Sequence, residues 1–260
     1  MTEPTFTHTR TIATPDGQSA FEDVVVPLVR DGPQRAISQT HSATALSFRY
    51  TPGEYAWDWH TAPRRRLIVM LAGALEVITS SGEARRFGVG DVLEVTDTTG
   101  QGHISRSANG EPFWSAFVDL DTEVARAEPG AEACRQRPDG PDAIVAFRTT
   151  VADSGAARND TIAVPLVDIR RSGRVSDDLP LTGFQIAWAS GDLDSGWHTT
   201  GRRQVVLPLT GGMDIEAGEG PRITVPPGGV YFSEDLTGAG HRTRAIAGQS
   251  RTAIFAHLAG

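Results

Sequence analysis

Two histidine-bearing segments stand out in the sequence, because imidazole is the side chain that most readily moves a proton or binds a metal near neutral pH. One segment is Trp-His at residues 59–60, and the other is a Gly-x-Gly-His that ends at His103. Both recur later, as Trp-His at residues 197–198 and as a Gly-x-Gly-His that ends at His241. The candidate chemistry is therefore metal binding or acid–base catalysis at two pairs of histidines.

These matches belong to a duplication of most of the chain. His60 and His198 are 138 positions apart, and so are His103 and His241. The alignment needs no gap from about residue 21 to about residue 120. Two motif clusters at one common offset predict two structural copies, each with its own pair of histidines.

The segments between the motifs have the pattern of short β-strands separated by turns. The chain contains 28 Gly and 16 Pro, and apolar runs such as residues 67–71 are bounded by turn residues. No helical pattern alternates with these runs, which disfavours a parallel β/α fold. The prediction is an all-β chain of two tandem β-barrels: residues 1–120 form the first, 121–147 a linker poor in apolar residues, and 148–260 the second.

The first half carries Gly53, His60 and Gly73, followed by Gly-Asp at residues 90–91 and then by His103. This series resembles the two sequence motifs of the cupin superfamily, and the resemblance covers most of the chain. It implies two jelly-roll barrels that pack together as an internal pseudo-dimer. It implies no single activity, because cupins include oxygenases, isomerases, cyclases and non-enzymatic binders.

The resemblance also implies a metal site of three His and one Glu, from which this chain departs. Asp58 stands at the first His position and Arg66 near the Glu position. Residues i and i+2 of a strand point to one face, so Asp58 and His60 are expected to face the barrel interior together. The prediction is a divalent metal (Fe, Mn, Ni or Zn) in the first barrel, bound by Asp58, His60 and His103. Arg66 opposes this site unless an anionic substrate lies between the two positive charges.

The second half is the poorer candidate for a metal, because Gly196 and Gln204 stand at the same two positions. The predicted catalytic residues are therefore those of the first half, namely His60, His103 and Arg66. The predicted substrate-binding residues have aromatic, amide, imidazole or guanidinium groups near the motifs, and they are Tyr50, Arg106, His198, Gln204, His241 and Arg244.

Three functions remain open on these grounds, the last of them a scaffold in which the two halves pack as an internal pseudo-dimer and no site is kept. The first is a metal-dependent enzyme of oxygenase, isomerase or cyclase type that acts on an anionic organic substrate. The second is a metal-free cupin that binds a small organic acid between Arg and His side chains, for sensing, sequestration or acid–base chemistry.

Composition excludes several other classes of function. The formal net charge of −8 disfavours nucleic acid and anionic membranes as partners. The chain has no Lys, which excludes pyridoxal phosphate held as a Schiff base, and no helix follows the motif glycines to bind a nucleotide phosphate. Cys134 is the only cysteine and residues 1–10 are polar. We therefore expect a cytoplasmic monomer or homodimer with a small-molecule ligand.

Overall fold

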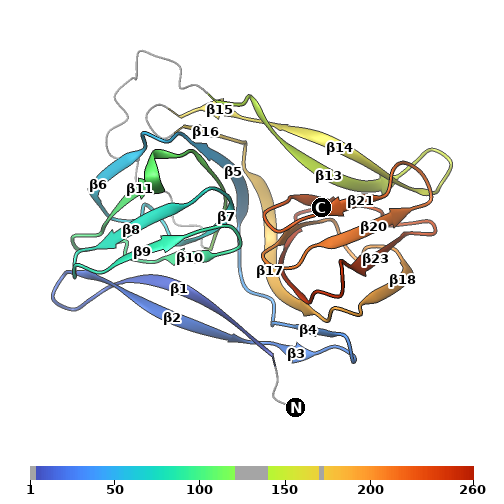
Figure 1. The fold of residues 1–260 in the computed structure, drawn as a ribbon, viewed down its shortest axis with the longest axis horizontal. Coiled ribbons are helices and arrows are strands. Elements are labelled where there is room, and N and C mark those ends of the chain that lie inside the picture. Colours follow the sequence, from blue (N-terminus) through green and yellow to red (C-terminus); the bar gives the residue numbers. More distant parts are fainter. Residues whose placement is uncertain (1–3, 121–139, 170–172) are drawn as a thin grey trace.

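The structure is a computed structural model that describes residues 4–120, 140–169 and 173–260 (Figure 1). Within these ranges every regular element is a β-strand, apart from one 3₁₀ turn at Ala108–Gly110. The all-β prediction is thus confirmed. Two barrels lie side by side, one from each half of the chain (Figure 1). No helix in the described ranges has the length and apolar character that a bilayer crossing needs.

The strands of the two halves correspond one to one, from β1 with β13 to β12 with β24. The first half contains β1 Thr5–Ala13, β2 Ser19–Pro27, β3 Val29–Arg30, β4 Arg35–Ile37, β5 Ala45–Thr51, β6 Ala56–His60, β7 Arg66–Ala72, β8 Leu75–Thr79, β9 Ala84–Phe87, β10 Val92–Val95, β11 His103–Ser107 and β12 Phe113–Asp119. The second half contains β13 Ala143–Val151, β14 Ala157–Pro165, β15 Val167–Asp168, β16 Arg174–Val175, β17 Leu179–Ala189, β18 Asp194–His198, β19 Gln204–Pro208, β20 Met213–Ala217, β21 Ile223–Val225, β22 Tyr231–Ser233, β23 His241–Ala245 and β24 Arg251–Leu258.

The order of strands is symmetric about the junction between the halves. The large sheet runs β14-β13-β22-β19-β24-β17-β5-β12-β7-β10-β1-β2, so matching strands take matching places on either side of the β17–β5 pair. Two four-stranded sheets, β6-β11-β8-β9 and β18-β23-β20-β21, complete the barrels. Each barrel thus has one wall from the large sheet and one from a small sheet, and the motif histidines lie in the small sheets.

Each half lends a short strand to the other half. Strand β4 of the first half pairs with β17, and β16 of the second half pairs with β5. Just after β4, the hydroxyl oxygen of Ser38 accepts a hydrogen bond from the backbone N–H of Ile186 at 3.0 Å. At the matching position, Ser176 accepts one from the N–H of Phe48 at 2.9 Å. The halves are thus joined by one contact that is made twice, in opposite directions.

A single hydrophobic core spans this junction, because the large sheet is continuous across both halves. Leu46 and Phe48 of the first half are fully buried in the same cluster as Leu207 and Ile254 of the second. Burying one such side chain contributes about 1.5–3 kcal/mol. Separating the barrels would expose these side chains, and the shared core therefore holds the barrels in their relative positions.

The predicted linker at residues 121–147 overlaps a strand. Strand β13 begins at Ala143 and pairs along its whole length with β14. The apolar residues 143–147 thus belong to the second barrel, and the boundary predicted at residue 148 is a few residues too late. Residues 121–139 of the predicted linker, with Cys134, lie outside the described residues.

We predict that Ser38→Ala and Ser176→Ala each lower the free energy of unfolding by about 1–3 kcal/mol. Either change leaves a buried backbone N–H of the other half without its acceptor. Urea unfolding at neutral pH would measure the effect, with Gln39→Ala, an exposed neighbour, as the control. A costly change at one serine with a neutral change at the other would contradict the equivalence of the two contacts.

Candidate functional site

The structure brings the two histidines of each half together on adjacent strands. His60 of β6 is in register with His103 of β11, and their ring centroids are 4.5 Å apart. His198 of β18 and His241 of β23 repeat this arrangement, also at 4.5 Å. Each barrel therefore contains a pair of imidazoles that can act on one bound molecule.

A β-bulge in β6 decides which side chains face the interior of the first barrel. In the register of β6 and β11, His60 is paired with His103, and Trp57 is paired with the residue two positions after His103. The two residues of β6 between these pairs therefore lie opposite a single residue of β11, Ile104. The extra residue shifts the alternation, so Trp57 and His60 both line the cavity, with their rings stacked at 4.6 Å. Asp58 is exposed and outside this lining. The prediction that Asp58 and His60 share the inner face is therefore wrong.

Different residues build the same bulge in the two halves. In the first half, the carboxylate of Asp58 accepts a hydrogen bond from the N–H of Trp59, and its carbonyl oxygen accepts one from His60 Nδ1, both at 2.8 Å. In the second half, Gly196 takes this place with a φ of 64°, and its carbonyl oxygen accepts from His198 Nδ1 at 3.1 Å. Glycine inside a strand indicates a bulge. Gly196 thus signals a bulge in the sequence, but it does not show which side chains the bulge turns inward.

A buried carboxylate orients the second histidine of each barrel. Asp97 Oδ2 accepts a hydrogen bond from His103 Nδ1 at 2.6 Å, while its Oδ1 accepts one from the hydroxyl of Thr11 at 2.7 Å. Asp235 and His241 repeat the contact at 2.7 Å. Such a bond keeps the proton on Nδ1 and fixes the orientation of the ring. Nε2 then points away from the carboxylate, toward the cavity. Sequence reasoning missed this role because each Asp precedes a Thr-Gly turn, where a turn-stabilising role explains it equally well.

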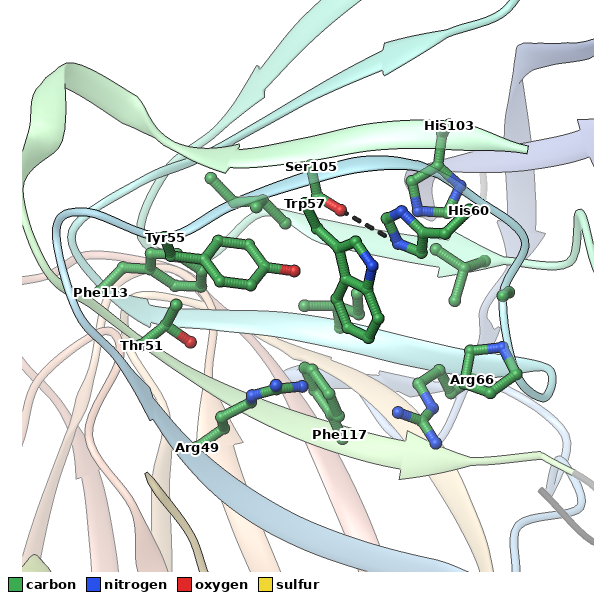
Figure 2. A pocket seen from close by; sticks show the side chains of 15 residues that line it. Arg49, Thr51, Tyr55, Trp57, His60, Arg66, His103, Ser105, Phe113 and Phe117 are labelled. Atoms are coloured by element: carbon green, nitrogen blue, oxygen red, sulfur yellow. Dashed lines mark hydrogen bonds between the residues drawn. The ribbon is translucent and has the colours of Figure 1, made fainter. Parts of the chain in front are cut away.

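Two guanidinium groups lie across the first cavity from the imidazoles (Figure 2). The guanidinium carbons of Arg49 and Arg66 are 5.3 and 5.0 Å from the ring centroid of Phe117. Arg66 also forms an ion pair with Asp119 at 3.1 Å. The sequence predicts Arg66 at this site but not Arg49, because the residue that matches Arg49 in the second half is Ala187 and the repeat does not single it out.

Three of the predicted substrate-binding residues lie outside both cavities. Tyr50 of β5 packs in the core between the barrels, with its ring 5.1 Å from that of Trp114. Arg106 and Arg244 form ion pairs with a glutamate of the adjacent strand, at 2.6 and 2.7 Å. Each follows an inward-facing histidine by three positions, and the alternation along a strand directs it to the outer face. These three residues therefore line neither of the two cavities, contrary to what is expected of substrate-binding residues.

The second cavity is roomier than the first because smaller side chains line it. The predicted residues His198, Gln204 and His241 all lie in its wall. Its volume is about 340 Å³, against about 60 Å³ for the first cavity. Ser195 stands at the place that Trp57 occupies in the first half. The duplicated walls thus enclose two different spaces.

The residues of the first cavity do not fit the metal centre that the sequence predicts. Asp58 faces outward, so the ligand set of Asp58, His60 and His103 is reduced to two imidazoles. A guanidinium, that of Arg66, stands where a carboxylate ligand is expected. In the part of the chain that the structure describes, no group of three or more His, Cys, Asp or Glu is placed to hold a metal ion. We therefore derive no chemistry through a metal.

The imidazole of His60 is kept neutral by its surroundings. Burial is the largest cause that lowers the pKa of His60 to about 4. Its Nδ1 donates to the carbonyl oxygen of Asp58, so Nε2 carries the lone pair and lies 3.4 Å from the hydroxyl of Ser105 (Figure 2). Burial also lowers the pKa of His198 in the second barrel. At neutral pH both imidazoles are therefore uncharged.

Comparisons with known proteins identify similar solved structures. No protein-family model and no curated protein matches the sequence. A cupin 2 conserved barrel domain protein from Leptotrichia buccalis is 11% identical, with a TM-score of 0.40, over 89% of this chain and 87% of that one. A putative glyoxylate-induced protein from Pseudomonas aeruginosa is 8% identical, with a TM-score of 0.41, over 89% and 84%. A salicylate 1,2-dioxygenase from Pseudaminobacter salicylatoxidans is 10% identical, with a TM-score of 0.34, over 86% and 71%. At these identities and scores, none of them assigns a substrate or reaction to this chain.

We predict that His60 makes the protein less stable as the pH falls from about 6.5 to about 4. An unfolded His binds a proton near pH 6.5, whereas folded His60 binds one near pH 4. Between these values the unfolded state holds more protons, so the free energy of unfolding falls with pH, by up to about 1.4 kcal/mol per pH unit. Urea unfolding across this range should show a shallower dependence for His60→Asn. An NMR titration of the His60 ring with a midpoint near 6.5 would contradict the prediction.

Proposed function

We propose that this duplicated, cupin-type chain binds a compact organic anion in its first barrel and transfers protons on it without a metal. The observation that carries the proposal is the composition of the first cavity wall. Two guanidinium groups and two imidazoles line it, and none of its described lining residues is acidic. The corresponding reaction classes are isomerisation and cyclisation, in which a carbon or oxygen acid loses and regains a proton.

The positive charge of the wall supports an anionic ligand. Asp119 forms ion pairs with both Arg64, at 2.6 Å, and Arg66, at 3.1 Å. Buried Arg49 (6% exposed) lies in the same wall. A carboxylate that enters beside Phe117 would form charge-assisted hydrogen bonds with this wall.

The imidazole wall supports proton transfer. Asp97 holds His103 with its Nε2 toward the cavity, and the buried carboxylate would stabilise the imidazolium formed when Nε2 takes up a proton. Neutral His60 presents a second Nε2 lone pair, 3.4 Å from the Ser105 hydroxyl. His103 is therefore assigned as the base and His60 as the second proton-handling group.

The shape of the cavity supports a small ligand. Tyr55, Trp57 and Phe113 fill much of the interior (Figure 2) and leave about 60 Å³. That space suits an acid of a few carbon atoms rather than a drug-sized molecule. The ring of Trp57 stacks on His60 at 4.6 Å and covers one face of the imidazole, and a less polar surrounding strengthens electrostatic contact with an anion.

We predict that metal-free protein binds at least one of pyruvate, malonate and acetoacetate and exchanges its acidic carbon-bound protons for deuterium. Calorimetry and NMR in D₂O would measure binding and exchange after treatment with EDTA. Arg49→Met should weaken binding about tenfold or more, through loss of charge-assisted hydrogen bonds. His103→Asn should keep binding within about threefold and slow exchange about a hundredfold or more, through loss of the base.

Arg106→Met is the control for these variants, because it removes a guanidinium from the outer face of the small sheet. It should change neither binding nor exchange. Binding without exchange would indicate the non-catalytic binder. Stoichiometric metal in protein purified without a tag, with no response to any of the three acids, would contradict the proposal.

A further inference from the structure

A buried guanidinium lines the second cavity. Arg251 of β24 is 8% exposed and forms part of the cavity wall. Among the described residues, no carboxylate forms an ion pair with it, and its buried Nη1 has no hydrogen-bond partner. Burial, together with the charge of Arg35, lowers the pKa of Arg251 to about 10. A charge in this position is costly unless a ligand neutralises it.

A second guanidinium comes from the other half of the chain. On one side of β17, Ala189 is paired with Arg35 of the lent strand β4, and on the other side it is paired with Arg251. In-register residues of adjacent strands point to the same face. With strands about 4.8 Å apart, the two Arg Cα atoms are about 10 Å apart. The small side chain between them leaves space in which both guanidinium groups can reach one anion.

The second barrel has no counterpart of Asp119, the carboxylate that forms ion pairs with arginines of the first barrel. At the place of Asp119 stands His257, whose Nδ1 accepts a hydrogen bond from Arg202 at 3.2 Å and is therefore unprotonated. Arg35, Arg202 and Arg251 all line the second cavity, and none of its described lining residues is acidic. The second cavity thus has a larger excess of positive charge than the first.

We propose that the second barrel is a separate binding site for an organic carboxylate, with Arg251 as its anchor and Arg35 as a second contact. The volume of about 340 Å³ accommodates the body of the acid. That body would lie against apolar wall residues such as Trp188, Met213 and Phe255. Because β4 belongs to the first half, the site is complete only in the duplicated chain. It is independent of the chemistry proposed for the first barrel.

The first test compares hexanoate with hexan-1-ol, which has the same apolar chain without the carboxylate. Calorimetry should show binding of hexanoate to the wild-type chain and at least tenfold weaker binding of the alcohol. Arg251→Met should weaken hexanoate binding about tenfold or more. The same variant should melt at an equal or higher temperature than wild type without ligand, because it removes an unpaired buried charge.

Hexanoate affinity and melting temperature, measured on the same variant, distinguish an arginine that binds the ligand from one that stabilises the fold. If Arg251→Met melts several degrees lower and still binds hexanoate as wild type does, the proposal is overturned. Arg251→Lys, which keeps the charge but loses the fork of the guanidinium, should bind with intermediate affinity and provides the test if the Met variant does not fold. Arg86→Met, a charge loss at an exposed position of β9, is the matched control and should bind hexanoate normally.

The second test addresses the residue lent by the first half and the class of anion. Arg35→Met should weaken hexanoate binding several-fold while the fold and the melting temperature are maintained. Inorganic phosphate should compete with hexanoate only weakly. Phosphate binding tighter than hexanoate binding would overturn the assignment to a carboxylate, and unchanged affinity in Arg35→Met would overturn the contribution of the first half.

Discussion

The pairing of β5 with β17, together with the two strands exchanged across it, is the constraint on which the rest of the structure depends. It makes one sheet of the two halves and buries one core between them. The contacts of Ser38 and Ser176 repeat across it in opposite directions, as in a symmetric dimer. Because the halves are covalently linked copies, each can diverge while the contact that joins them is preserved.

That divergence is greatest inside the barrels. Both keep the bulge, the pair of imidazoles and the buried carboxylate behind the second histidine. Around this common frame, the first barrel has large aromatic rings and two arginines, of which Arg66 is paired with Asp119. The second has smaller side chains, a histidine in place of that carboxylate and an arginine with no carboxylate partner in the described ranges. One frame thus encloses two cavities with different linings, as the proposed division between proton transfer and binding requires.

The bulge shows how a local irregularity controls the chemistry of a site. One extra residue before His60 turns Asp58 outward and Trp57 inward. A carboxylate that would favour a cation is replaced by an aromatic ring that stacks on the imidazole. With Arg49 and Arg66 opposite, the electrostatic character of the cavity changes from one that suits a metal ion to one that suits an anion.

The sequence by itself determined the duplication, the all-β class and the identity of the histidines that meet in each barrel. These follow from local patterns and from a repeat with one constant offset. Tertiary structure alone decided that Asp58 faces outward, that Arg49 and Arg251 line the cavities and that Arg35 reaches the barrel of the other half. The physical reason is that the direction of a side chain on a strand depends on register and bulges, which are set by pairing between segments far apart in the chain.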